Sequence, residues 1–282
     1  MLKVFGFVRR HPDLTHDEYR AAHVGYHNSY GRRLNNIRGY VLNVRANASI
    51  EQTLGPAASD ITRNELSGFD TLWDGWGQLL FDSLETYLSA KTPARDKAGP
   101  YGLEDDPRVA AVGGDGPWLY GGSPFQFMVV EHVAMPVRRP ERKVFKLTQF
   151  AKQQPGLPSE LFRSYLTGRY AARLIQLPGL RGLVMNFRTP LDVMSKFFEP
   201  GAEGFTPKGV AEREKFFGAW DCLTELWFDR AEQFIAGRVA TPLAAYLDTL
   251  ETELFDSVCY REVDETVAVL PNRAPAPAYY HR

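Results

Sequence analysis

Residues 15–44, THDEYRAAHVGYHNSYGRRLNNIRGYVLNV, form the stretch that decides the fold of this chain. Thr15 followed three residues later by Glu18 is the capping-box pattern that begins an α-helix. Helical spacing then places five side chains on one face: Tyr19, His23, His27, Tyr30 and Leu34. From Ile37 the pattern alternates every two residues, as in a β-strand. The stretch therefore predicts a helix, a tight turn and a strand.

The same pattern returns in the second half of the chain. RGYVLNVR at 38–45 reappears as RGLVMNFR at 181–188, an offset of 143 residues. DGWGQLLFD at 74–82 reappears as DCLTELWFD at 221–229, an offset of 147. Upstream, KVF at 3–5 reappears as KVF at 143–145 if a gap of three residues is allowed in the loop that follows. The chain therefore contains an internal repeat.

Each copy reads strand, helix, strand, strand, helix, strand, which is the order of a ferredoxin-like α+β unit. Such a unit leaves one sheet face bare, and two copies can pack sheet to sheet. We therefore expect an intrachain dimeric α+β barrel, with a first repeat at 1–138, a second at 139–270 and an extended tail at 271–282. Long insertions at 46–68, 90–123 and 199–209 are either site-covering loops or plain surface insertions.

Composition limits the class of protein. The 282 residues carry 33 Lys and Arg against 34 Asp and Glu, a net charge of −1, so no basic face for nucleic acid is expected. The first residues form neither a signal peptide nor a membrane span, so we expect a cytoplasmic protein without membrane contact. Cys222 and Cys259 are too far apart for a close metal-binding pair, and we interpret them as reduced, packed thiols.

The two histidines are the main difference between the copies. Where the first copy has His23 and His27, the second has Leu166 and Tyr170, on a face that is otherwise apolar. The pair is either hydrogen-bonded core, the better interpretation for His23, or a general acid–base group at a pocket between helix and sheet. A metal held by His-x-x-x-His needs at least one further ligand, and we expect none.

Further candidates lie on the predicted strands. Asn43 is expected to face the helices, with Tyr40, Leu42 and Val44 turned into the barrel core. Asp74 is either a partner for a histidine or a turn cap, because the second copy also has Asp there. The aromatic residues are either core or the lining of a hydrophobic pocket. The candidate substrate-binding side chains are Tyr19, Tyr26, Tyr30, Asn43, Asp74, Trp76, Glu131, Phe5 and Phe7.

At this point the chain resembles the EthD family of dimeric α+β barrel proteins, named for ethyl tert-butyl ether degradation. The resemblance rests on Tyr19, His27, Leu34, residues 37–39 and Tyr40 in the family's spacing, and on the later DG-rich strand. It covers both halves and implies a tandem version of the fold. It also implies a functional role for His27, whereas the second copy has Tyr170 at that position.

These observations lead to a prediction of function. We expect a cofactor-free lyase or isomerase, of the dehydratase or decarboxylase type that the resemblance suggests. His27 and His23 would be catalytic, moving a proton on a hydrophobic aromatic or polyketide-like carbonyl compound. Two alternatives remain: a cofactor-independent monooxygenase, as in related barrels, and a non-catalytic protein that binds a hydrophobic molecule in a degradation pathway. We expect no heme, and the sequence shows no flavin or nicotinamide fingerprint. Two chains could still form a homodimer through their exposed helices.

Overall fold

The structure, a computed structural model, describes residues 1–32, 34–91, 116–139, 143–196, 198, 200–239 and 241–271. Its strands follow the predicted order in both halves. They are β1 (Leu2–Val8), β2 (Gly39–Arg45), β3 (Gly75–Phe81), β4 (Phe125–Met135), β5 (Phe145–Gln153), β6 (Gly182–Asp192), β7 (Cys222–Phe228) and β8 (Phe255–Val269). The α+β class predicted from the repeat is confirmed.

The strands close into one antiparallel barrel in the order β1-β3-β2-β8-β5-β7-β6-β4. Each half supplies a four-stranded sheet, β4-β1-β3-β2 or β8-β5-β7-β6. The two sheets join at both edges, where β2 pairs with β8 and β4 pairs with β6. Edge pairing of this kind removes the exposed backbone groups that an open ferredoxin-like sheet would leave. The intrachain α+β barrel is therefore closed by hydrogen bonds as well as by a shared core.

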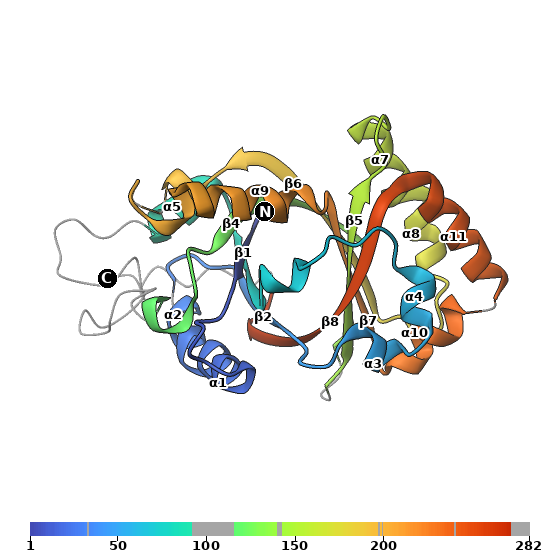
Figure 1. The fold of residues 1–282 in the computed structure, drawn as a ribbon, viewed down its shortest axis with the longest axis horizontal. Coiled ribbons are helices and arrows are strands. Elements are labelled where there is room, and N and C mark those ends of the chain that lie inside the picture. Colours follow the sequence, from blue (N-terminus) through green and yellow to red (C-terminus); the bar gives the residue numbers. More distant parts are fainter. Residues whose placement is uncertain are drawn as a thin grey trace.

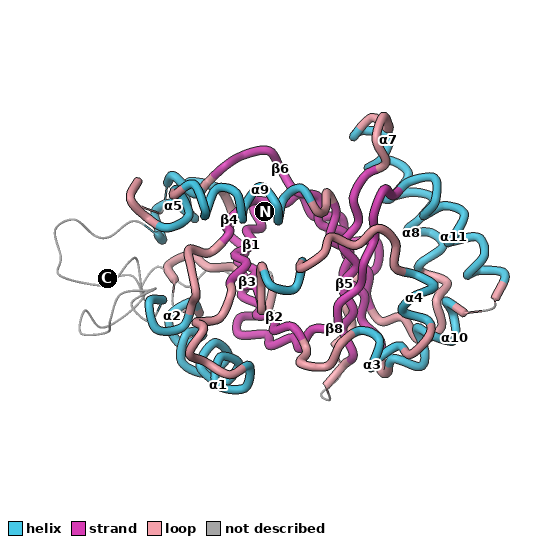
Figure 2. The backbone as a smooth tube through the Cα atoms, viewed as in Figure 1, coloured by secondary structure: helices cyan, strands magenta, loops and turns pink. Residues whose placement is uncertain are grey.

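Helices cover the barrel on two opposite sides (Figures 1 and 2), with α1, α2 and α5 on one side and α8, α10 and α11 on the other. The α-helices are α1 (His16–Ala21), α2 (Asn28–Gly31), α3 (Ile50–Leu54), α4 (Ala57–Ile61), α5 (Leu84–Lys91), α6 (Gly116–Leu119), α7 (Ser159–Tyr165), α8 (Ala171–Leu174), α9 (Pro207–Gly218), α10 (Ala231–Arg238) and α11 (Pro242–Leu254). Short 3₁₀ turns are η2 (Phe69–Thr71), η4 (Met194–Lys196) and η5 (Glu203–Phe205). None of the helices in the described part of the chain has the length and apolar character needed to cross a membrane.

The long helix predicted from residue 15 begins as expected, with both hydrogen bonds of the Thr15–Glu18 capping box present. It then widens into a π-helical turn, η1 (Ala22–His27), before ending as α2. The second half has the same feature in η3 (Leu166–Tyr170). Because the half without histidines also contains it, the π turn belongs to the shared scaffold.

Strand register corrects the predicted match between the two halves. In β1, Lys3 pairs with Leu80, and in β5, Lys146 pairs with Trp227, which stands 147 residues after Leu80. The counterpart of Lys3 is therefore Lys146, with no gap. The predicted match of Lys3 with Lys143 was wrong. It relied on the identical tripeptide KVF at 143–145, which lies almost entirely before β5 begins at Phe145.

The barrel interior is aromatic at one end. The buried aromatic residues of this cluster come from both halves: Phe5, Phe7, Phe69, Trp73, Trp76, Phe125, Phe127, Phe150, Phe216 and Trp220. Phe7 illustrates the packing, with its ring 5.0 Å from Trp76 and 4.9 Å from Phe216. α9 contributes Phe216 and so covers this end of the barrel.

Elsewhere the interior holds a reciprocal ionic network. Lys3 Nζ donates to Asn186 Oδ1 of the other half at 2.8 Å, and Lys146 Nζ donates to Asn43 Oδ1 at 2.6 Å. Glu225 lies between both lysines, 3.4 Å from Lys3 Nζ and 2.6 Å from Lys146 Nζ. Burial alone would raise the pKa of Glu225, but the ammonium groups of Lys146 and Lys3 lower it to about 2. The network ties the two halves together inside the barrel.

This interior corrects the predicted orientation of β2. Asn43 points into the barrel, whereas Tyr40 and Leu42 pack on the helix side with Leu34 and Ile37. The prediction assumed that the apolar face of the strand turns inwards. It was wrong because this barrel encloses lysines and carboxylates, which need polar partners such as an amide.

Candidate functional site

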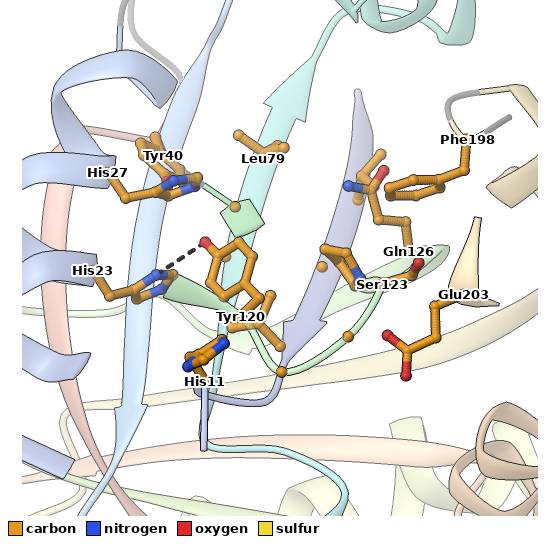
Figure 3. A pocket seen from close by; sticks show the side chains of 18 of the residues that line it. His11, His23, His27, Tyr40, Leu79, Tyr120, Ser123, Gln126, Phe198 and Glu203 are labelled. Atoms are coloured by element: carbon orange, nitrogen blue, oxygen red, sulfur yellow. Dashed lines mark hydrogen bonds between the residues drawn. The ribbon is translucent and has the colours of Figure 1, made fainter. Parts of the chain in front are cut away.

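A cavity of about 730 Å³ lies on the outer face of the first-half sheet, between that sheet and the helix that carries His23 and His27 (Figure 3). Three strands supply its floor, β1, β2 and β3, and β4 supplies one edge. The segment 116–124 and two residues from the second half, Phe198 and Glu203, complete the walls. The predicted pocket between helix and sheet is present.

Two glycines leave the floor bare. Gly6 of β1 and Gly77 of β3 are register partners, so two adjacent positions on neighbouring strands lack side chains. The Tyr40 ring borders one side, because a Cβ on Gly77 would lie 3.4 Å from it. Gln126 borders the other side as the register partner of Gly6. The bare floor spans two strand spacings, roughly 10 Å, which suits a flat ring system.

A column of aromatic rings forms the helix wall. Tyr19, His23 and His27 follow one another along one helix face, and their rings stack with centroid distances of 5.2 Å and 5.4 Å. His23 and His27 line the cavity, whereas Tyr19 is fully buried behind them. His27 is half-buried and is the histidine of the pair with the more open ring.

Tyr120, in the wall segment 116–124, contacts both histidines of this column. Its hydroxyl lies 3.2 Å from His23 Nδ1, and its ring meets both imidazoles edge to face (Figure 3). Hydrogen bonds between His11 N and Leu119 O and between Gly121 N and Arg9 O hold that segment against the end of β1. Sequence analysis missed Tyr120, because its neighbourhood has no periodic pattern and offered no signal.

His23 is held neutral by its surroundings. Its side chain is 2% exposed, and Nε2 has no hydrogen-bond partner among the described residues. Burial lowers the pKa of His23 well below its usual 6.5, and the neighbouring His27 lowers it further. A neutral His23 imposes no charge repulsion on His27 when that imidazole takes up a proton.

The opposite wall is polar but sparse, with Gln126, Ser123 and Glu203 (Figure 3). Ser123 Oγ accepts from Gly204 N at 3.0 Å, which anchors the second-half segment at the cavity. The insertion after β6 of the second half therefore crosses to the first half and supplies part of the wall.

Most other predicted site residues lie away from the cavity. Phe5, Phe7 and Trp76 belong to the barrel interior, as does Asn43, whereas Glu131 is an exposed residue. Successive side chains of a strand point to opposite faces of the sheet. The neighbours of the cavity-lining residues therefore point into the barrel. Glu131 accepts from Lys3 Nζ at 2.6 Å.

The remaining three predicted residues also fall outside the cavity wall. Asp74 pairs with Arg10 at 2.7 Å and with Arg45 at 3.2 Å, which fits its predicted structural alternative rather than a partnership with a histidine. Tyr26 is 58% exposed on the helix surface. The side chain of Tyr30 lies outside the part of the chain that the structure describes.

The described residues contain no group of three or more His, Cys, Asp or Glu side chains arranged to hold a metal ion. Cys222 and Cys259 are both buried and free, and burial raises each thiol pKa to about 12. Neither thiol is therefore available as a thiolate at neutral pH.

No protein-family model matches this sequence, and no curated protein matches it. Solved structures do match. A "putative monooxygenase" from Fusobacterium nucleatum subsp. nucleatum gives a TM-score of 0.53 at 9% identity, covering 96% of this chain and 95% of that one. An anthrone oxidase-like protein gives 0.51 at 9% identity, covering 98% of this chain and 96% of that one.

The chain has the dimeric α+β barrel fold. At such low identity the likeness shows this fold alone. The narrower resemblance to the EthD family stays a prediction.

Proposed function

We propose that this protein is a cofactor-independent monooxygenase. Its substrate would be a hydrophobic, flat ring ketone with an acidic C–H group, of the anthrone kind. The observation that carries the proposal is the cavity itself: His27 and a neutral His23 face a bare floor formed by Gly6 and Gly77. The names of the two structural neighbours favour oxygenation over the lyase or isomerase chemistry expected from the sequence.

In this proposal His27 removes a proton from a CH₂ carbon conjugated with the ring carbonyl. The enolate then reduces dioxygen and forms a carbon–oxygen bond, giving a hydroperoxide that loses water. One oxygen atom stays on the carbon as a carbonyl and the other leaves as water. The substrate supplies all four electrons, so the reaction needs no external reductant.

The cavity offers what this first step requires. His27 lines the cavity, and imidazole is the side chain most often used as a general base. Tyr120 packs edge-on against the ring and limits its rotation. Few polar side chains line the rest of the cavity, so the orientation of a bound ketone would depend on those few contacts.

The decisive test uses anthrone in air-saturated buffer. We expect oxygen uptake and formation of the corresponding quinone in equal amounts. His27→Ala should lower turnover by about 10²–10⁴-fold, the usual contribution of a general base. His132→Ala is the control, since His132 lies on β4 outside the cavity and should leave turnover unchanged.

The same assay without oxygen separates the alternatives. An isomerase or lyase would convert substrate anaerobically, whereas the monooxygenase would only exchange the acidic C–H hydrogen with solvent deuterium. A binding protein would bind anthrone without either change. Full oxygen uptake by His27→Ala would refute the assignment of the base.

A further inference from the structure

Gln126 occupies a special position at the edge of the cavity floor. It lies on β4 beside Gly6, and a Cβ built on Gly6 would be 3.7 Å from Gln126 Cγ and 4.0 Å from Nε2. The amide group therefore hangs over the bare floor. Figure 3 shows it across the cavity from His23 and His27.

A buried tyrosine fixes which way this amide points. Tyr87 is fully buried, and its hydroxyl donates to Gln126 Oε1 at 2.9 Å. Burial raises the pKa of Tyr87 far above its usual 10, so the hydroxyl keeps its proton and remains the donor. With Oε1 engaged by Tyr87, the NH₂ end is left for the cavity that Gln126 lines.

We propose that the Gln126 amide binds the substrate oxygen on which negative charge develops, and that Tyr87 positions this amide. The inference rests on the proposed function and deepens it. When His27 removes the proton, charge moves through the ring system to the carbonyl oxygen. A fixed N–H donor stabilises that oxyanion more than the neutral ketone, which lowers the barrier.

The second half supports the assignment by contrast. There Gln149 stands at the position of Gly6 and pairs with Tyr260. The Tyr260 hydroxyl accepts a hydrogen bond from Gln149 Nε2 at 2.7 Å. These two side chains bond to each other instead of facing an open floor. The free amide and the bare glycines therefore occur together, in the half that has the histidines.

The test measures ionisation of a bound probe, 2-naphthol, a two-ring phenol whose anion has its own absorption band. The wild-type protein should lower the pKa of bound 2-naphthol relative to water. Gln126→Leu should raise that bound pKa by about one to two units, since a hydrogen bond to a charged oxygen has roughly this value. Tyr87→Phe keeps the ring but frees the amide, and should give a smaller rise.

Controls keep the test independent of turnover. Gln176→Leu removes an exposed glutamine in the turn after α8, where its amide donates to Ala172 O, and should leave the bound pKa unchanged. His27→Ala should lose turnover yet retain the effect of Gln126 on the probe. An enzyme inactive on every ketone would therefore sink the proposed oxygenase while the role of Gln126 still stood.

Two results would overturn the inference. One is a Gln126→Leu protein that folds, binds 2-naphthol and shows the same bound pKa as the wild type. The other is a wild-type protein that binds no 2-naphthol, because the floor described here should accept it. If Gln126→Leu fails to fold, the Tyr87→Phe protein alone decides, and an unchanged bound pKa there refutes the positioning role.

Discussion

The space between helix and sheet is open in one half of this barrel and filled in the other. Two rows of cross-strand neighbours correspond position by position: Gln126, Gly6, Gly77 and Leu42 in the first half, and Tyr260, Gln149, Thr224 and Met185 in the second. Replacing Gln149 and Thr224 by glycines is thus the change that bares the floor. The comparison teaches that two absent side chains bare the cavity floor while the strand register stays the same in both halves.

The filled side is held by a buried polar network. Gln149 Nε2 donates to the hydroxyl of Tyr170 at 2.6 Å, and that hydroxyl donates to Glu251 Oε1 at 2.6 Å. Arg238 completes the network at 3.1 Å from Glu251. Tyr170 stands where the first half has His27, so the same helix position serves packing in one half and the proposed chemistry in the other.

The insertions exchange sides as well. α3 and α4 follow β2 of the first half but pack in the core of the second half, through Ile50, Leu54 and Ile61. The insertion after β6 of the second half instead brings Glu203 to the cavity of the first. Each half therefore shapes the space of the other, which a separate repeat could not do.

The largest expected effect is a loss of stability when the buried network of the filled half is disrupted. Arg238→Met should lower the free energy of unfolding by about 3–5 kcal/mol, because it leaves the carboxylate of Glu251 buried without its main cation. Chemical denaturation monitored by fluorescence measures this. Lys208→Met is the control, since its ion pair with Glu212 is exposed and 4.0 Å long, and little change is expected. Binding of 2-naphthol should be unaffected in both proteins.

The second expected effect is a loss of ligand affinity when side chains are added to the bare floor. Gly6→Gln with Gly77→Thr copies the second half, and should weaken 2-naphthol binding by about tenfold to hundredfold, or about 1.4–2.8 kcal/mol. Isothermal titration measures this. Gly6→Ala should weaken binding less, because its Cβ would only touch Gln126 at 3.7 Å. Unchanged affinity in the double variant would mean that the ligand does not use this floor.

The smallest effect concerns His23, whose counterpart is Leu166. Because the pKa of His23 is lowered in the folded state, the unfolded chain binds a proton first as pH falls below 6.5. Stability is therefore complete above pH 6.5 and declines below it. His23→Leu should remove this loss, up to about 2 kcal/mol at pH 5. Unfolding free energies at pH 7.5 and 5 measure it, and an equal acid loss in both proteins would contradict the assignment.

Local sequence patterns were reliable where the cause is local. The Thr15–Glu18 capping box gave the start of a helix, and the repeated Arg-Gly strand gave the order of elements in both halves. Alternation along β2 separated its two faces correctly but did not say which one faces the barrel. Apolar character misled there, because Lys146 inside the barrel needs the Asn43 amide.

The site itself depended on distant contacts. Tyr120 reaches His23 from 97 residues away, and Gly6 meets Gly77 only because β1 and β3 pair in one register. No local pattern encodes such pairings, since strand register is fixed by the closure of the whole sheet. The sequence by itself thus determined two α+β halves and a histidine pair on an inward helix face. The tertiary structure decided that this face opens on a cavity, because only the folded barrel brings two bare positions, one amide and one tyrosine together.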